Sequence, residues 1–119
     1  MIVLIADDFE EHRLLMRQVA ERMGHHVLEA KDGREAVEAA ARERPDLILL
    51  DLALPVFDGL TVARRVREGV RGRGPFIVAI TAYDTYGFRE AAIEAGCDEY
   101  TAKPTDADEL QNLLTRFLG

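Results

Sequence analysis

Positions 46–51 hold the sequence DLILLD. The residues between its two acids are all apolar, and Asp51 closes the run. A short, unbroken apolar run of this kind is typical of a strand buried on both faces, as in a parallel sheet with helices on either side. The stretch therefore predicts an α/β fold in which a carboxylate stands at the end of one buried strand.

Two other apolar segments and the last, more polar segment also end in polar groups. The segments and the residues that close them are Ile2–Ala6 with Asp7 and Asp8, 76–80 with Thr81, and 97–102 with Lys103. Parallel neighbours bring their carboxyl ends to the same edge of a sheet. We therefore expect three carboxylates, a hydroxyl and an ammonium group to meet there.

Helical patterns alternate with strand patterns along the chain. Strands are predicted at Ile2–Ala6, His26–Ala30, 46–50, 76–80 and 97–102. An amphipathic helix is predicted after each strand, the first at about 11–23. Asp32 and Glu35 have the spacing of a capping box at the start of the second helix. This alternation predicts a (βα)₅ unit with an open, doubly wound parallel sheet.

The polarity of the strands predicts their order. The segment His26–Ala30 contains Glu29, and the last segment contains Asp98 and Glu99, which suits edge positions. The first, third and fourth segments are more apolar than these two, which suits the first and third to central positions. With right-handed crossovers the order becomes 2-1-3-4-5.

The overall composition fits one globular domain that spans residues 1–119. The net charge of -7 argues against direct binding to nucleic acid. No apolar stretch approaches the roughly 20 residues that a membrane span needs. With Cys97 as the single cysteine and no signal peptide pattern, we expect a cytoplasmic protein. We also expect either a monomer or a weak dimer.

The predicted strand order suggests a site between the first and third strands, where ligands bind in open α/β sheets. Asp7, Asp8 and Asp51 would lie there, and their mutual repulsion would be relieved by a hard cation such as Mg²⁺. Asp51 could attack phosphorus, and Lys103 and Thr81 could neutralise charge on the transferred phosphoryl group. No residue of these motifs is an evident general base for water, which favours a phosphoryl group that persists as a signal.

Over its full length the chain resembles the receiver domain of bacterial two-component response regulators, a CheY-like family with a flavodoxin-like fold. The residues that carry the resemblance are Asp7, Asp8, Asp51, Pro55, Asp58, Gly59, Thr81, Ala82, Gly96, Tyr100, Lys103 and Pro104. Each of them alone is a weak signal, but their order and spacing together are specific.

The resemblance implies a role for each site residue. Asp51 is expected to be the phosphoacceptor, and Asp7, Asp8, Asp51 and the backbone carbonyl of Ala53 to be the Mg²⁺ site. Thr81 and Tyr100 are expected to form the switch, with Lys103 on the phosphoryl charge.

The resemblance also implies partners. The phosphoryl donor is expected to be a sensor histidine kinase or a histidine phosphotransfer protein. A downstream protein target is expected to read a changed surface around the fourth helix, fifth strand and fifth helix. The protein would thus be a phosphorylation-switched signalling domain and not a turnover enzyme.

The chain departs from the family pattern at Ala53, Phe57, Tyr83 and Thr105. The family positions of Ala53 and Tyr83 influence how water reaches the phosphoryl group, so the lifetime of the signal stays open. The Lys103–Pro104 bond is open too: a cis bond would aim the lysine inward, whereas a trans proline would begin the last helix.

Three other functions are weighed against this one. A phosphatase of the haloacid dehalogenase type would have a second Asp where this chain has Ala53. A degenerate receiver would bind a partner without phosphorylation, but the acid set is intact. A flavin carrier would have a Ser/Thr/Gly-rich loop after the first strand, and that loop is missing.

Overall fold

The structure, a computed structural model, describes residues 1–69, 74–82, 88–104 and 106–118. In these residues a five-stranded parallel sheet has the order β2-β1-β3-β4-β5. The elements are β1 (Ile2–Ala6), α1 (Glu10–Arg22), β2 (His26–Ala30), α2 (Gly33–Glu43), β3 (Leu47–Asp51), α3 (Gly59–Glu68), β4 (Phe76–Thr81), α4 (Phe88–Ala95), β5 (Glu99–Ala102) and α5 (Ala107–Leu118). The predicted (βα)₅ fold and its strand order are confirmed.

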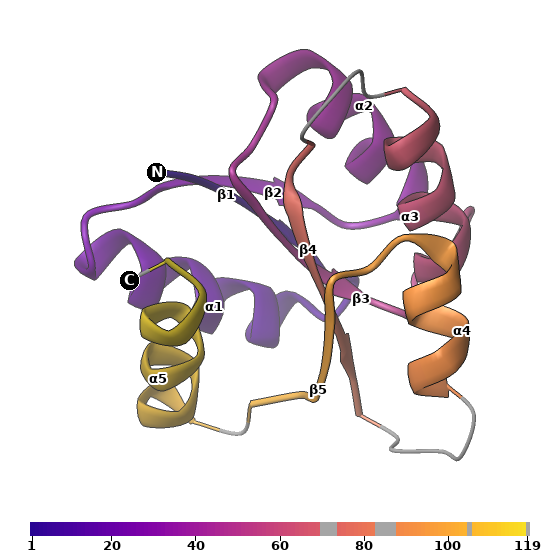
Figure 1. Cartoon of the computed structure of the whole chain (residues 1–119). Helices are drawn as coiled ribbons and strands as arrows, with labels where there is room; N and C mark the ends of the chain where they lie inside the picture. Colours follow the sequence, from indigo (N-terminus) through magenta and orange to yellow (C-terminus); the bar gives the residue numbers. More distant parts are fainter. Residues whose placement is uncertain (70–73, 83–87, 105, 119) are drawn as a thin grey trace.

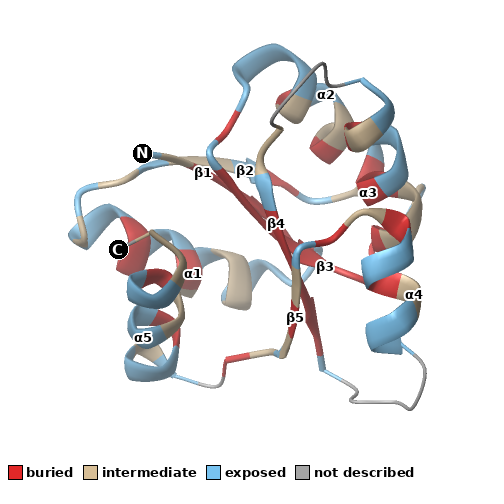
Figure 2. Ribbon diagram, viewed as in Figure 1, coloured by how far each residue is buried: buried red, intermediate tan, exposed pale blue. Residues whose placement is uncertain are grey.

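Helices cover both faces of the sheet (Figure 1). Helices α1 and α5 lie on one face, and α2, α3 and α4 lie on the other. Figure 2 shows that the central strands between these layers are almost wholly buried. This two-sided cover explains why DLILLD has no polar residue between its ends, since a strand of a parallel sheet buries both of its faces.

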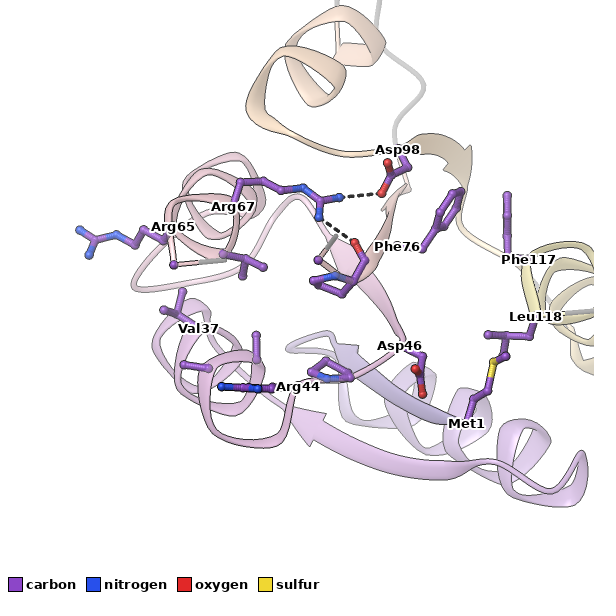
Figure 3. Close-up of a pocket in the computed structure, with 17 residues that line it drawn as sticks. Met1, Val37, Arg44, Asp46, Arg65, Arg67, Phe76, Asp98, Phe117 and Leu118 are labelled. Carbon is purple, nitrogen blue, oxygen red and sulfur yellow. Dashed lines mark hydrogen bonds and ion pairs between the residues drawn. The ribbon is translucent and has the colours of Figure 1, made fainter. Parts of the chain in front are cut away.

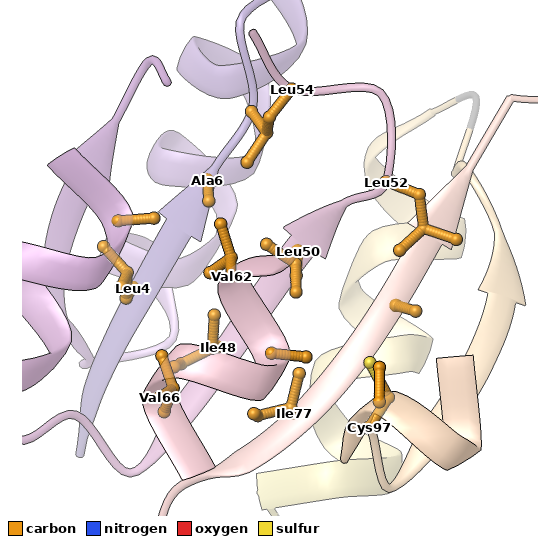
Figure 4. Packing of buried hydrophobic residues seen from close by; sticks show 14 of the residues in the cluster. Leu4, Ala6, Ile48, Leu50, Leu52, Leu54, Val62, Val66, Ile77 and Cys97 are labelled. Atoms are coloured by element: carbon orange, nitrogen blue, oxygen red, sulfur yellow. The ribbon is translucent and has the colours of Figure 1, made fainter. Parts of the chain in front are cut away.

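Alternate residues of each central strand enter different cores. In β3, Leu47 and Leu49 pack with α1 and α5, whereas Ile48 and Leu50 pack with α2, α3 and α4. Figure 4 shows the second core, where Val62 and Val66 of α3 lie over the strands. The pleat of a strand, which sends successive side chains to opposite faces, produces this division.

Aspartate side chains begin two of the helices next to the site. The side chain of Asp32 accepts a hydrogen bond from Glu35 N–H at 2.8 Å, and that of Asp58 accepts one from Thr61 N–H at 2.9 Å. Such caps satisfy donors that a helix start leaves free. The predicted capping box at Asp32 is confirmed in part, because Glu35 returns its bond to the N–H of Lys31 and not to that of Asp32.

The strand ends differ slightly from the sequence prediction. Asp51 and Thr81 are the last residues of β3 and β4 and not the first residues beyond them. The register sets Asp51 opposite Ile80 and Thr81 opposite Ala102, so the carboxyl ends of the three strands are level. The Lys103–Pro104 peptide bond is trans, but Pro104 does not begin the last helix, because α5 starts at Ala107.

Candidate functional site

Three carboxylates converge at the carboxyl edge of the sheet. One oxygen from each of Asp7, Asp8 and Asp51 lies within 4.8 Å of the others. Asp7 and Asp51 are buried, and Asp8 is exposed. We call Asp7, Asp8, Asp51 and Lys103 the acid pocket. Its three acids have the hard oxygen donors that suit a divalent cation such as Mg²⁺, and the exposed one gives a cation access from solvent.

Lys103 lies between two of these carboxylates. Its Nζ is 2.9 Å from Oδ2 of Asp7 and 3.2 Å from Oδ2 of Asp51, and its side chain is 11% exposed. Its backbone N–H donates to the carbonyl of Thr81 at 2.8 Å, which ties the turn after β5 to the end of β4. The predicted convergence of the first, third and last strand ends is therefore present in the structure.

The surroundings of Lys103 stabilise its charged form. Burial alone would lower the pKa of the ammonium group. The hydrogen bond to Asp7 and the negative charges of Asp51 and Asp7 outweigh burial, so the pKa is raised. Lys103 thus offers a fixed positive charge beside Asp51.

Asp7 is held by contacts on every side. Its backbone N–H donates to the carbonyl of Ala30 at 3.0 Å, and Oδ1 accepts from the N–H of Phe9 at 2.9 Å. Burial raises the pKa of its carboxyl, and the hydrogen bonds from Lys103 and Phe9 oppose this only in part. A buried carboxylate with a raised pKa benefits from a further positive charge, as a bound cation would supply.

Arg13 is a residue of the site that the sequence did not predict. Its Nη1 donates to the backbone carbonyl of Asp7 at 2.8 Å, and its Nε donates to Oε1 of Glu29 at 3.1 Å. The guanidinium therefore joins α1, the end of β1 and β2. Nothing in the sequence distinguishes Arg13 from the other arginines of α1, because this contact depends on how α1 packs beside β2.

Asp51 is fixed by the loop that follows it. Its Oδ1 accepts from the N–H of Ala53 at 2.9 Å, and the N–H of Gly59 donates to the carbonyl of Leu52 at 3.1 Å. A Cβ on Gly59 would lie 2.7 Å from the carbonyl oxygen of Asp51, closer than side chains pack. The start of α3 thus packs directly against the backbone of Asp51, the predicted phosphoacceptor.

The two predicted switch residues are buried. Thr81 ends β4 and is 7% exposed, next to the backbone of Lys103. Tyr100 in β5 belongs to the core under α2, α3 and α4, and the guanidinium of Arg89 lies 5.6 Å from its ring centre. Their switch roles stay predictions, and Tyr83 and Thr105 lie outside the described residues.

A separate groove lies at the opposite, amino edge of the sheet (Figure 3). It is lined by residues such as Asp46, Phe76 and Phe117, from the starts of β3 and β4 and the end of α5. Asp46 directly precedes β3 and Asp51 ends it, so this groove is not part of the acid pocket.

Comparison with known proteins bears directly on this arrangement. A family model described as the response regulator receiver domain matches residues 3–115. The chain belongs to this family. The receiver domain is thus identified by a match over nearly the whole chain and by the convergence of its acids.

Individual relatives cover almost the whole chain. Polar-differentiation response regulator DivK of Brucella anthropi is 32% identical over 98% of this chain and 95% of its own length. Sporulation initiation phosphotransferase F of Bacillus subtilis is 31% identical over 98% of this chain and 92% of its own. The receiver domain of a sensor histidine kinase of Pseudomonas aeruginosa, crystallised with a magnesium ion in its active-site cleft, is 36% identical with a TM-score of 0.86, covering 99% of this chain and 97% of that one.

In the part of the chain that the structure describes, every helix is too short or too polar to cross a lipid bilayer.

Proposed function

We propose that this receiver domain accepts a phosphoryl group on Asp51, from a phosphohistidine of a sensor kinase or a phosphotransfer protein, in the presence of Mg²⁺. One observation carries the proposal: Lys103 Nζ lies within 3.2 Å of Asp51 Oδ2, where the carboxylates of Asp7 and Asp8 also converge. A nucleophilic carboxylate, a fixed cation and metal-binding oxygens are the groups that phosphoryl transfer requires.

In the proposed reaction, a carboxylate oxygen of Asp51 attacks phosphorus while the bond from phosphorus to the imidazole nitrogen breaks. The electron pair of that bond remains on the nitrogen, and the imidazole leaves. Lys103 neutralises charge on the phosphoryl oxygens, and the Thr81 hydroxyl donates a hydrogen bond to one of them.

The Mg²⁺ ion would be held by Asp7, Asp8, Asp51 and the carbonyl of Ala53, and would lower the charge on the transferred group. The contacts of Asp7 support this assignment. Phe9, Lys103, Arg13 and Ala30 already fix its carboxylate and backbone, so Asp7 would act from a rigid position. Asp8, which is exposed, is the acid that a cation entering from solvent meets first.

The output is proposed to run through Thr81 and Tyr100 to the surface formed by α4, β5 and α5. Arg89 of α4 lies over the ring of Tyr100, so movement of that ring would shift Arg89 and change the surface of α4. Phe88 and Ile93 of the same helix are exposed and available to a protein target. In this proposal the domain assists its own phosphorylation and is not a turnover enzyme on a separate substrate. Its cytoplasmic location stays a prediction.

Intact-mass measurement tests the phosphoacceptor. With acetyl phosphate and Mg²⁺ the protein should gain about 80 Da, the mass of one phosphoryl group. Asp51→Asn should abolish the adduct. Asp46→Asn, at the other end of β3, should leave it intact. Release of free phosphate with no adduct would favour a hydrolase, and an unmodified protein would favour a degenerate receiver that only binds partners.

A further inference from the structure

The loop between β3 and α3, residues 52–58, is held in its middle by a different element. The backbone N–H of Gly33, the first residue of α2, donates to the carbonyl of Pro55 at 3.0 Å. Gly33 is buried, and the side chain of its neighbour Asp32 caps α2. The turn from β2 to α2 therefore supports the loop that follows Asp51.

This contact leaves no room for a side chain. A Cβ on Gly33 would lie 2.1 Å from the carbonyl oxygen of Phe57 and 2.5 Å from its Cβ. Both neighbours are at or next to the backbone, so a rotamer change cannot relieve the overlap. Any larger residue at position 33 must displace the loop or the start of α2.

The loop offers few other ways to adjust. Val56 has φ 70°, a left-handed conformation that is costly for a β-branched residue, and it directly follows Pro55, whose carbonyl is bonded to Gly33. The Arg65 guanidinium lies 4.3 Å from the ring centre of Phe57, and Gly59 is seated on Leu52. Displacement at Phe57 would therefore move the loop as a unit, including Ala53 near its start.

The same turn also supports the other side of the acid pocket. The carbonyl of Ala30, which ends β2, accepts the hydrogen bond from the N–H of Asp7. Residues 30–33 thus contact both the end of β1 and the β3–α3 loop. These two segments contribute Asp7, Asp8 and the proposed ligands Asp51 and Ala53.

We propose that Gly33 is a positioning residue of the acid pocket, which sets the β3–α3 loop so that Asp51 and the Ala53 carbonyl can share one cation with Asp8. The inference rests on the proposed function, because it concerns the same Mg²⁺ site. Gly33→Ala should leave the protein folded but weaken Mg²⁺ binding by about tenfold, as losses of support behind metal ligands commonly do.

The matched control is Gly69→Ala. Gly69 ends α3, and a Cβ there would meet its nearest atom at 3.6 Å, an ordinary contact. Mg²⁺ affinity is measured by calorimetric titration of wild type and both variants, each checked for its folded fraction by circular dichroism. The proposal is overturned if folded Gly33→Ala binds Mg²⁺ within about twofold of wild type.

A second measurement needs no variant. In the wild-type protein, Mg²⁺ should slow hydrogen exchange of the Gly33 amide several-fold, because a cation that fixes the loop also fixes the Pro55 carbonyl that this amide contacts. The Gly69 amide should not respond. Unchanged exchange at Gly33 under saturating Mg²⁺ would overturn the proposal even if Gly33→Ala failed to fold.

The two proposals can fail separately. If wild type binds no Mg²⁺, the proposed function is wrong. The contact between Gly33 and the β3–α3 loop can then still be tested by NMR of the metal-free protein. Gly33→Ala should change the chemical shifts of the Ala53 and Gly59 amides, and Gly69→Ala should not. The absence of those shifts would refute the positioning role.

Discussion

Asp7 is a buried carboxylate in a cluster with more negative than positive charge. Burial raises its pKa above the ordinary 3.8, so the folded protein favours the protonated form more than the unfolded chain does. Ionisation of Asp7 therefore opposes folding; this cost is absent well below pH 3.8 and grows as the pH rises through the raised pKa. The metal-free protein carries this cost at neutral pH.

Asp7→Asn should accordingly stabilise the metal-free protein at pH 7 by about 1 kcal/mol. Asparagine keeps an oxygen for the N–H of Phe9 and removes one negative charge. Its amide nitrogen then stands beside the Lys103 ammonium, which must turn to Asp51 as its acceptor, and this keeps the gain small. Urea unfolding of both proteins measures the difference in their free energies of unfolding. This difference should shrink below pH 4, where Asp7 of the wild type approaches its protonated form. A variant less stable than wild type at pH 7 would contradict the electrostatic argument, and one that still bound Mg²⁺ tightly would contradict the assignment of Asp7 as a ligand.

The residues of the acid pocket were predictable from sequence because strand ends reveal them. Asp7, Asp8, Asp51 and Lys103 each follow or close a predicted strand, and parallel pairing brings such ends together. Arg13 and Gly33 gave no such signal. Their roles come from packing between elements that the sequence places about 20 residues apart, such as Gly33 and Pro55.

Among the elements, the fifth strand shows where a sequence pattern misleads. The sequence predicted a strand from about Cys97 to Ala102, but β5 begins at Glu99. The N–H of Cys97 donates to Ala92 and that of Gly96 donates to Ile93, which is the hydrogen-bond pattern of a Schellman helix end. Gly96, at φ +115°, adopts the left-handed conformation that this ending needs, so Cys97 belongs to the end of α4.

A single arginine joins three elements at the amino edge of the sheet. Arg67 of α3 donates to the carbonyls of Gly96 at 2.8 Å and Pro75 at 2.7 Å and forms an ion pair with Asp98 at 2.6 Å, two of which Figure 3 draws. The same Asp98 oxygen accepts from the N–H of Ile77 at 2.8 Å. Arg67 therefore links α3 to the start of β4 and to the turn before β5.

Arg67→Met should lower the free energy of unfolding by about 2 kcal/mol, because it leaves two partly buried carbonyls without their donor and removes the ion pair of Asp98, which keeps the N–H of Ile77. Arg64→Met, an exposed position on the same helix, should change it by less than about 0.5 kcal/mol. Chemical denaturation of both variants makes the comparison. Equal stability of the two would mean that the three contacts of Arg67 contribute nothing beyond those of a surface side chain.

At the scale of the whole molecule, two clusters of polar contacts lie at opposite edges of the sheet. The carboxyl edge holds the acid pocket, where three carboxylates face one ammonium group, and the amino edge holds the satisfied contacts of Arg67. The apolar layers between them were predictable from the alternation of strands and helices. At the carboxyl edge the carboxylates outnumber the ammonium group that faces them, and burial raises the pKa of Asp7 there.

Mg²⁺ should therefore stabilise the whole fold. At ten times its dissociation constant, a ligand that binds only the folded state adds about 1.4 kcal/mol, which for a domain of this size raises the melting temperature by about 5 °C. A calorimetric or circular-dichroism melt in MgCl₂ measures the shift, and NaCl at equal ionic strength corrects for screening. Asp8→Asn should lose most of the gain, because it removes the exposed ligand without touching the Lys103 contacts. An equal shift in wild type and in Asp8→Asn would place the ion elsewhere and refute the acid pocket as its site.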